Sequence, residues 1–466
     1  MNGTPNPSGI IAAEVVAAQP PCVREANATA AAQRKTILTL SSVAFTLMFA
    51  VWLMFGVLGI PIRKEFALTE VQFGWLTAIA ILNGSIWRLL FGLWTDRFGG
   101  RLVMTLLVGA TALPAFLVSS AASFNELMVY AFLVGMAGNA FSVGIAWNSA
   151  WFPRQRQGLA LGVFGAGNVG ASVTKFIGPA LIALVPVAGL LGGKVPGGWR
   201  FVPFLYGVLL LGMAAAIWFL CPAQDHKPGA GRPLRELLRP LRQVRVWRFS
   251  LYYVVVFGAY VALSVWLPKY YVDFFGMPLQ KAALLTALFI FPASLLRPLG
   301  GWLSDKFGAR RMMYWVFATM LLALLVLSAP QGHIVLYVPE KIHAGGQVET
   351  MRFVMGPGLF TVLIFIVGCG MGIGKAAVYK YIPEYFPKDV GTVGGLVGLL
   401  GALGGFFLPL LFAYAFKLTG IPQTTFAILF LVTLVSFAWL HWVVYRILHQ
   451  ATPRLKDQFE MRKAPS

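Results

Sequence analysis

The chain has 466 residues, of which 58% are hydrophobic and 11% charged, and its formal net charge is +21. Soluble domains carry about 25% charged residues, so this composition excludes a soluble globular protein and indicates a protein integral to a membrane. The three cysteines (Cys22, Cys221, Cys369) are far apart, which excludes a disulfide framework and a thiolate metal site.

The chain begins with residues 1–36, which are rich in Ala, Pro and Asn and lack an apolar core with a cleavage site. We interpret them as a disordered cytoplasmic tail and not as a signal peptide. Apolar runs of about 20 residues then predict membrane-spanning helices. Twelve such runs lie near residues 37–61, 72–95, 102–121, 126–151, 158–185, 200–221, 249–272, 282–304, 311–329, 357–381, 391–416 and 421–446.

These runs fall into two sets of six, residues 37–221 and 249–446, joined by residues 222–248 and followed by a cytoplasmic C-terminal tail, 447–466. Most Lys and Arg residues lie in the two tails and in alternate loops, which predicts that both termini are cytoplasmic. The linker 222–248 is strongly basic, and we expect it to contact anionic lipid headgroups of a bacterial inner membrane. This topological distribution argues against nucleic acid as a partner.

The two halves share an internal repeat. The segment RLLFGLWTDRFGGR (88–101) matches RPLGGWLSDKFGAR (297–310), with Arg, Leu, Gly, Asp, Phe, Gly and Arg at the same spacing. Such a repeat is typical of secondary transporters. Both segments resemble the loop motif of the major facilitator superfamily, which implies an all-α membrane fold of two pseudo-symmetric six-helix halves. Helix-end charges can hold one of two conformations, so the predicted conformational latch is Asp96, Arg97, Arg101, Asp305, Lys306 and Arg310.

Each copy of the repeat begins with an arginine inside an apolar run. Arg88 and Arg297 both lie eight residues before the motif aspartate, hence ~12 Å from the helix end and near mid-membrane. An arginine at that depth costs at least ~2.5–3.5 kcal/mol and is too deep to snorkel. Either each bonds backbone carbonyls at a broken helix, or the two face each other across a cavity. The second alternative explains their symmetry, and two guanidinium forks suit a small planar oxyanion.

Glycine-rich runs follow in the fifth and eleventh predicted helices, where small residues allow close helix packing. The helix-packing signature is Gly165, Gly167, Gly170, Gly398, Gly401 and Gly404. Together with the two arginines and FAVWLMFG (49–56), these runs resemble the nitrate/nitrite porter family of the NarK type. The resemblance implies that Arg88 and Arg297 clamp the substrate and that Asn168 is the signature asparagine, although Ala402 takes the equivalent place in the second run. It also implies aromatic walls from Phe49, Phe141, Tyr253 and Phe257.

The resemblance leaves the coupling mode open, since the family contains proton-coupled importers and nitrate/nitrite exchangers. Lys375 lies ~13–14 Å deep and, unlike an arginine, can lose its proton when buried. We therefore expect Lys375 to be the proton-coupling group of a nitrate/proton symporter that also accepts nitrite. The alternatives are a nitrate/nitrite antiporter, a carrier of phosphate or a small carboxylate, and an anion channel.

The remaining expectations concern partners and flanking segments. No enzymatic motif is present, so we expect a transporter and not an enzyme, without cofactor or metal. We also expect it to be a monomer. Lys175 is expected to snorkel to the outer interface, and residues 330–356 to form a solvated outer loop.

Overall fold

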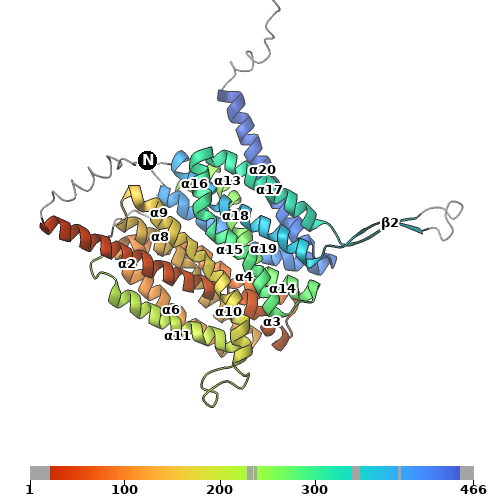
Figure 1. Ribbon diagram of the computed structural model, residues 1–466, viewed down its shortest axis with the longest axis horizontal. Helices are drawn as coiled ribbons and strands as arrows, with labels where there is room; N and C mark the ends of the chain where they lie inside the picture. The colour runs from red at the N-terminus through yellow and green to blue at the C-terminus, as the bar shows by residue number, and fades with distance from the viewer. Residues whose placement is uncertain (1–20, 228–234, 236–238, 338–346, 387–389, 452–466) are drawn as a thin grey trace, which may run out of the picture.

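The computed structural model describes residues 21–227, 235, 239–337, 347–386 and 390–451. Its described part consists almost entirely of helices (Figure 1). The first half contains α2 (Pro21–Trp52), α3 (Phe55–Glu65), α4 (Glu70–Ile86), α5 (Arg88–Phe98), α6 (Gly100–Ser119), α7 (Phe124–Val134), η1 (Gly135–Asn139), α8 (Ala140–Trp151), α9 (Arg154–Gly165), η2 (Ala166–Val169), α10 (Gly170–Leu184), η3 (Gly198–Arg200) and α11 (Phe201–Leu220).

The second half follows the same order of helices and adds one hairpin. Its elements are η4 (Arg239–Arg242), α13 (Val244–Tyr253), the π-helical η5 (Val254–Gly258), α14 (Ala259–Phe275), α15 (Leu279–Leu295), α16 (Arg297–Phe307), α17 (Ala309–Ser328), β1 (Gly332–Tyr337), β2 (Gln347–Phe353), α18 (Pro357–Tyr385), α19 (Val390–Thr419) and α20 (Thr424–Ala451).

Ten helices within the described residues are long and apolar enough to cross a membrane, and the bent pair α15–α16 makes an eleventh. The remaining predicted span, 158–185, lies across α9, η2 and α10, where a 3₁₀ turn interrupts the helix. The arrangement is therefore consistent with the predicted all-α membrane fold of two halves.

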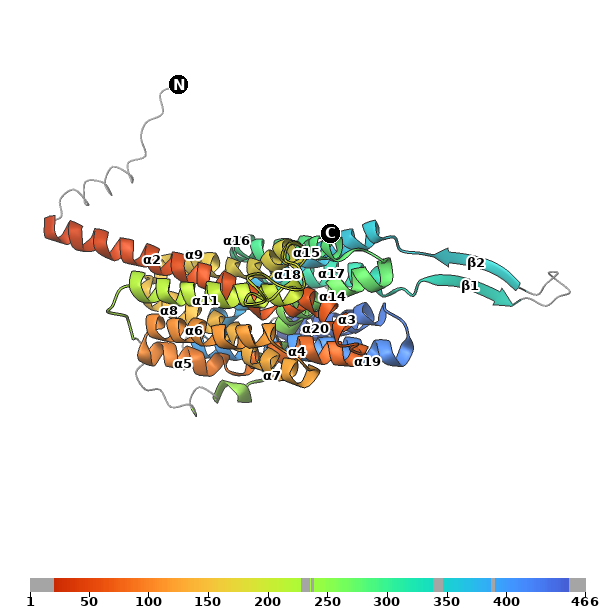
Figure 2. The ribbon, with the colours of Figure 1, turned by 90° about the horizontal axis from the view of Figure 1, so that it is seen from below.

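Three helix pairs make the largest contacts between the two halves. Helix α4 lies against α19, α10 against α15, and α3 against α14. We call the end of the bundle with the α5–α6 turn, the α16–α17 turn and residues 221–243 the linker face, and the opposite end the outer face. In Figure 2 the first turns of α2 project from the linker face and the β1–β2 hairpin from the outer face.

The repeated loop motif has a physical reason for its glycines. Gly99 ends α5 with φ 94° and Gly308 ends α16 with φ 84°. Side chains other than hydrogen are disfavoured at such angles, so glycine at these two positions lets the chain turn directly into α6 and α17.

Two segments differ from the expectations. Helix α2 begins at Pro21, so residues 21–36 continue the first spanning helix instead of forming a disordered tail, and residues 1–20 lie outside the described part. Within the expected outer loop, residues 332–337 and 347–353 form the antiparallel strands β1 and β2, in which Gly332 pairs with Phe353 and Tyr337 with Gln347. Cross-strand backbone hydrogen bonds, which an apolarity pattern does not register, order these two strands.

Candidate functional site

Arg88 lies in the interior of the bundle, at an interruption between α4 and α5. Its side chain is 2% exposed. Nε donates to the Gly84 carbonyl at 2.9 Å, and Nη1 donates across to the Gly398 carbonyl of α19 at 3.5 Å. Nη2 is buried and has no hydrogen-bond partner. Carbonyls of both halves therefore orient this guanidinium and leave one of its nitrogens available to an acceptor.

Arg297 occupies the equivalent place in the second half. It begins α16 after a 42° bend from α15. Pro292 lies inside α15 and Pro298 in the first turn of α16, and proline bends helices because it lacks the N–H donor. Nη1 of Arg297 is buried without a hydrogen-bond partner. The two symmetry-related arginines thus each present an unpaired nitrogen within the bundle.

One aromatic ring lies against both guanidiniums. The Phe141 ring of α8 is centred 5.5 Å from the Cζ of Arg88 and 5.5 Å from that of Arg297. The ring face carries negative charge density that attracts a guanidinium. Arg88 and Arg297, from the two halves, are therefore brought to a common centre.

Three rings of the second half form another path between the arginines. Phe257 lies 5.3 Å from the Arg88 Cζ and stacks on Tyr253 at 4.9 Å. Tyr253 meets Tyr379 edge to face at 5.1 Å, and Tyr379 lies 5.6 Å from the Arg297 Cζ. The Tyr253 hydroxyl is buried and has no hydrogen-bond partner. The two guanidiniums are thus surrounded by aromatic rings, and the Tyr253 hydroxyl is an additional hydrogen-bond donor without a partner.

The π-helix η5 positions Tyr253 and Phe257. A π-turn inserts an extra residue into a helix and is frequent at functional sites. Gly258 packs so closely on α19 that an added Cβ would lie 2.6 Å from the Gly401 carbonyl. A Cβ on Gly401 would lie 2.3 Å from Tyr253. The glycines of α19 therefore let the ring-bearing segment approach the centre.

The other signature glycines also lie at close contacts. A Cβ on Gly165 would lie 3.2 Å from Arg297 Nη1, and one on Gly398 would lie 2.9 Å from the Tyr379 hydroxyl. The remaining three contact neighbouring helices: Gly167 and Gly170 contact α2, and Gly404 contacts Val254. Space at Arg297 and at the Tyr379 hydroxyl thus depends on two of these positions having no side chain.

Asn168 lies in the 3₁₀ turn η2 of the interrupted fifth span. Its side chain is fully buried, and neither Oδ1 nor Nδ2 has a hydrogen-bond partner. Buried amide groups are rarely left unsatisfied. Its backbone carbonyl accepts from the Tyr260 hydroxyl at 3.3 Å. Asn168 is thus a further buried group with unused hydrogen-bonding capacity.

Lys375 of α18 lies behind the aromatic path. It is fully buried, donates to the Ala293 carbonyl at 3.0 Å and lies 3.2 Å from the centre of the Tyr260 ring. Phe257, which contacts Arg88, is 5.7 Å from Lys375 Nζ. Tyr260 thus links the two residues: its ring lies against the Lys375 ammonium, and its hydroxyl donates to the Asn168 carbonyl.

The centre has an excess of positive charge. In the described part of the chain, no carboxylate pairs with Arg88, Arg297 or Lys375, since the ion pairs there involve other residues. Buried charges without a counter-charge are costly. A small anion binding between the guanidiniums would supply that counter-charge.

Some residues of the site were not predicted, and one predicted residue lies further out. Trp52 contacts Arg88 at 5.3 Å, whereas Phe49 packs on Trp52 at 5.4 Å and no ring contact joins it to an arginine in the described chain. Trp52 lies in the FAVWLMFG segment, and Tyr379 lies four residues after Lys375. Each of the two rings is therefore close in sequence to a residue that was predicted to belong to the site. Lys175 does not snorkel: α10 packs between α2 and α15, and this lysine is 1% exposed and donates to the Leu53 carbonyl at 3.3 Å.

The motif charges at the linker face have different partners in the two halves. Asp305 pairs with Lys380. Asp96 has no ion pair within the described residues, and Asp225, which was not predicted, accepts from the Arg101 backbone N–H at 2.7 Å and from the Trp151 indole at 2.6 Å. The side chains of Arg97 and Lys306 lie on neighbouring aromatic rings, and Arg310 donates to the Tyr385 hydroxyl at 3.4 Å.

Comparisons with known proteins identify the family. Residues 40–339 match the Major Facilitator Superfamily. The chain is 68% identical over 429 residues to the "Probable nitrate/nitrite antiporter NarK1" of Thermus thermophilus, covering 92% of this chain and 96% of that protein. It is 32% identical to the "Nitrite extrusion protein" of Bacillus subtilis (strain 168), covering 87% and 94%, and 32% identical to the "Probable nitrate transporter NarT" of Staphylococcus carnosus (strain TM300), covering 84% and 91%.

The fold is also that of solved transporters. A bacterial homologue of the human lysosomal transporter Spinster, in an inward-facing and occupied conformation, superposes with a TM-score of 0.67 at 16% identity, over 93% of this chain and 99% of that one. The nucleoside transporter NupG (D323A mutant) gives 0.62 at 11% identity, over 88% and 99%. The chain therefore belongs to the major facilitator superfamily, and within it to the nitrate/nitrite porter family of the NarK type.

Proposed function

We propose that this protein is a secondary transporter that carries nitrate, and also nitrite, across the bacterial inner membrane by alternating access. The observation that carries the proposal is the pair of buried, unpaired nitrogens on Arg88 and Arg297, which come from different halves and share the Phe141 ring. The names of the three relatives, which refer to nitrate or nitrite, support the choice of anion.

The binding step follows from the donor geometry. A planar oxyanion accepts hydrogen bonds from both guanidiniums, and hydrogen bonds to charged groups contribute about 1.5–3 kcal/mol each. The Tyr253 hydroxyl supplies a further donor. We propose that the Asn168 amide, which is also buried without a partner, supplies another, and that the rings exclude water from the faces of the anion. Water exclusion strengthens each electrostatic interaction, since attraction rises as the local dielectric falls.

Transport requires that the two halves rock about the bound anion. Without it, two guanidiniums in a low dielectric repel each other, which opposes their approach. With it, one anion joins a cation of each half, so closure around the substrate is favoured. The loaded carrier then reorients more readily than the empty one.

The conformation of the outer face agrees with this scheme. Arg63 of α3 pairs with Glu70 of α4 and Asp273 of α14, at 2.6 Å each. Lys269, 1% exposed, pairs with the same two carboxylates at 2.6 and 2.8 Å. These four residues, here called the outer ion-pair cluster, join the first half to the second. We propose that they hold the outer face closed while the linker face, which we assign to the cytoplasm, opens.

We propose that the motif residues at the linker face form the conformational latch, with some contacts made in this state and others made only in the opposite state. The Asp305–Lys380 pair and the contacts of Asp225 with Arg101 and Trp151 join helix ends within each half. They stiffen each half, so that the halves move as bodies. Asp96 has no ion pair among the described residues of this conformation, and we propose that it gains one in the other.

Two coupling modes remain as candidates. Lys375 is buried next to the site without a described carboxylate partner, which favours proton coupling: anion binding would stabilise the protonated lysine. The name of the Thermus relative favours nitrate/nitrite exchange instead. In an exchanger, the repulsion between Arg88 and Arg297 in the empty site is sufficient to prevent the carrier from reorienting without a bound anion.

The test is nitrate uptake into proteoliposomes, first with a pH gradient alone and then with internal nitrite alone. Uptake driven by the pH gradient supports symport, and uptake that requires internal nitrite supports antiport. Competition by phosphate, formate and acetate tests the anion class, and nitrate counterflow distinguishes a carrier from a channel. Uptake that nitrate itself does not saturate, or that phosphate inhibits more strongly than nitrite, would refute the proposal.

A further inference from the structure

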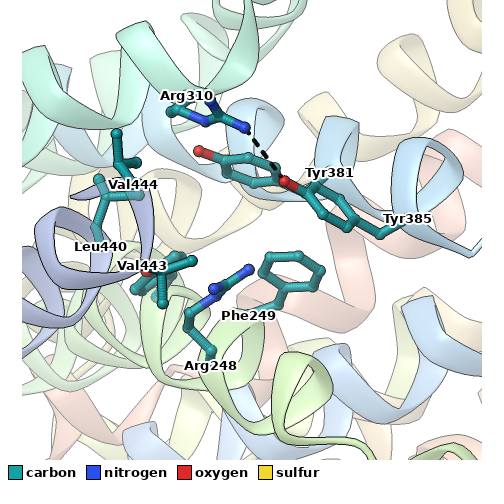
Figure 3. Close-up of a pocket in the computed structure, with 9 residues that line it drawn as sticks. Arg248, Phe249, Arg310, Tyr381, Tyr385, Leu440, Val443 and Val444 are labelled. Atoms are coloured by element: carbon teal, nitrogen blue, oxygen red, sulfur yellow. Dashed lines mark hydrogen bonds between the residues drawn. The ribbon is translucent and has the colours of Figure 1, made fainter. Parts of the chain in front are cut away.

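Lys175 is a cation buried outside the central site. Cationic side chains at helix ends keep their charged groups in water: Arg310, for example, is exposed at the linker face, where it donates to the Tyr385 hydroxyl (Figure 3). Lys175 lies instead within α10 and is 1% exposed. Its ammonium donates to the Leu53 carbonyl at 3.3 Å and forms no ion pair within the described residues. A charge buried in this way without a counter-charge is costly.

Two further groups without partners lie on the same face of this span. Asn168 and Ser172 precede Lys175 by seven and three residues, a spacing that places all three on one side of a helix. Asn168 is fully buried and Ser172 is 1% exposed. The amide atoms of Asn168 and the Ser172 hydroxyl have no hydrogen-bond partner among the described residues. We call these three residues the outer polar stripe.

The outer polar stripe faces the other half of the protein. A second side of the span, with Gly167, Gly170 and Thr174, lies on α2. A third side is turned outward, since Phe176 and Ile177 are 47% and 41% exposed. The remaining side therefore lies toward α15, the helix of the second half against which α10 packs.

The hydroxyl of Thr174 shows how polar groups of this span are satisfied where they face their own half. It donates to the Ala50 carbonyl at 3.1 Å and shares a hydrogen bond of 2.6 Å with the Tyr206 hydroxyl. Contacts within one half persist when the halves rock as rigid bodies, whereas contacts between α10 and α15 change. Buried polar groups are normally satisfied, so unsatisfied groups at this interface indicate a partner that binds in the other conformation.

The symmetry-related helix of the second half has no such stripe. The Phe-Pro pairs at 152–153 and 386–387 align the fifth span with α19. In this alignment Ala402, Phe406 and Pro409 take the places of the outer polar stripe, and all three are buried. Helix α19 packs against α4 of the first half as α10 packs against α15, so contact between the halves forms without polar side chains at these positions. Packing alone therefore does not explain the stripe.

The outer polar stripe leads from the central site toward the outer face. Asn168 lies in η2, and Lys175 is seven residues, hence ~10 Å, further toward the outer end of α10. The carbonyl that Lys175 binds belongs to Leu53, the residue after Trp52 of the central site. In this conformation the outer ion-pair cluster joins the halves at the outer face. When the halves part there, α10 separates from α15 and the stripe becomes accessible from outside.

We propose that the outer polar stripe binds the transported oxyanion, nitrate or nitrite, when the outer face is open, and passes it to or from Arg88 and Arg297. The inference rests on the proposed transport function and adds an outer binding position to it. The ammonium supplies the counter-charge, and the Ser172 hydroxyl and the Asn168 amide supply further donors. In the conformation described here α15 covers this position, so the anion is held by the central pair alone.

The experiment measures counterflow of labelled nitrate in right-side-out and inside-out membrane vesicles, which offer nitrate to the outer face and to the linker face, from a host without nitrate transport of its own. Lys175→Gln should raise the KM at the outer face at least about tenfold, because a hydrogen bond to a charged group is lost, and leave the KM at the linker face unchanged. Ser172→Ala removes only one hydroxyl, keeps the test valid if the lysine variant misfolds, and should raise the outer KM at least about twofold. Lys194→Gln removes an exposed lysine from the loop after α10 and is the matched control, with both KM values unchanged.

A rise in KM confined to the outer face supports the inference. Equal rises at both faces indicate a structural lysine, and outer KM values of Lys175→Gln and Ser172→Ala that both equal the control leave the stripe without a role. Either result overturns the inference while nitrate transport itself stands. Absence of saturable nitrate counterflow in the unmodified protein refutes the proposed function and the outer binding position with it.

Discussion

Replacing Arg88 by lysine keeps the positive charge at the centre and removes the fork of donors. In the structure, Nε and Nη1 of Arg88 bind the carbonyls of Gly84 and Gly398, and Nη2 remains for the anion. A lysine has a single nitrogen, which cannot reach both carbonyls and the anion at once.

The expected loss is at least one charged hydrogen bond. Such a bond contributes about 1.5–3 kcal/mol, so the Kd for nitrate should rise about tenfold to about a hundredfold. Carbonyl bonds orient Arg88, whereas the bend of α15–α16 positions Arg297. Arg297→Lys should therefore lower the affinity for nitrate without freeing a side chain that carbonyls had oriented. Arg88→Lys loses both the donor and this orientation, so its Kd for nitrate should rise more.

The assay is nitrate binding to the purified protein, with counterflow in proteoliposomes as the functional readout. Arg446→Lys is the matched control, because Arg446 is exposed and lies on Trp442 near the end of α20. If Arg88→Lys binds nitrate within about threefold of the unmodified protein, then a charge alone is sufficient and the argument from paired forks is refuted.

Three further predictions concern coupling, packing and gating. Lys375→Gln should abolish uptake driven by a pH gradient and retain nitrate exchange; unchanged proton dependence would contradict the coupling role. Gly401→Ala places a methyl group 2.3 Å from Tyr253 and should reduce nitrate uptake at least about fivefold, since overpacking costs about 1–3 kcal/mol, whereas Gly212→Ala, with no atom within 4 Å of the added Cβ, should be silent. Asp273→Asn removes one carboxylate from Arg63 and from the buried Lys269. An exposed pair such as that of Arg63 contributes about 1 kcal/mol or less and the loss of a partner costs a buried ion more, so the substitution should raise maleimide labelling of a cysteine at Ser264 at least roughly fivefold; equal labelling with and without the substitution would argue against the outer ion-pair cluster as a gate.

The sequence alone predicted the features that depend on local composition. Apolar runs indicated the spanning helices, because the bilayer requires about 20 such residues in a row. The repeat at 88–101 and 297–310 indicated two related halves, and it marked Arg88 and Arg297 because charges at that depth are expensive. These signals are contained in short stretches of sequence, so no knowledge of the packing was needed.

Only the tertiary structure decided which groups meet. Phe141 lies against both arginines, and Tyr379 completes the second aromatic path, although these rings come from helices distant in sequence. Asp225, with no motif around it, accepts from the Arg101 backbone N–H at the turn into α6. The carbonyls of Gly84 and Gly398 accept hydrogen bonds from Arg88 because the helix is interrupted between α4 and α5 and because α19 of the other half packs against it. Apolar periodicity reports which residues avoid water, but the partners of a buried polar group depend on helix crossings and helix breaks, which are properties of the whole assembly of helices.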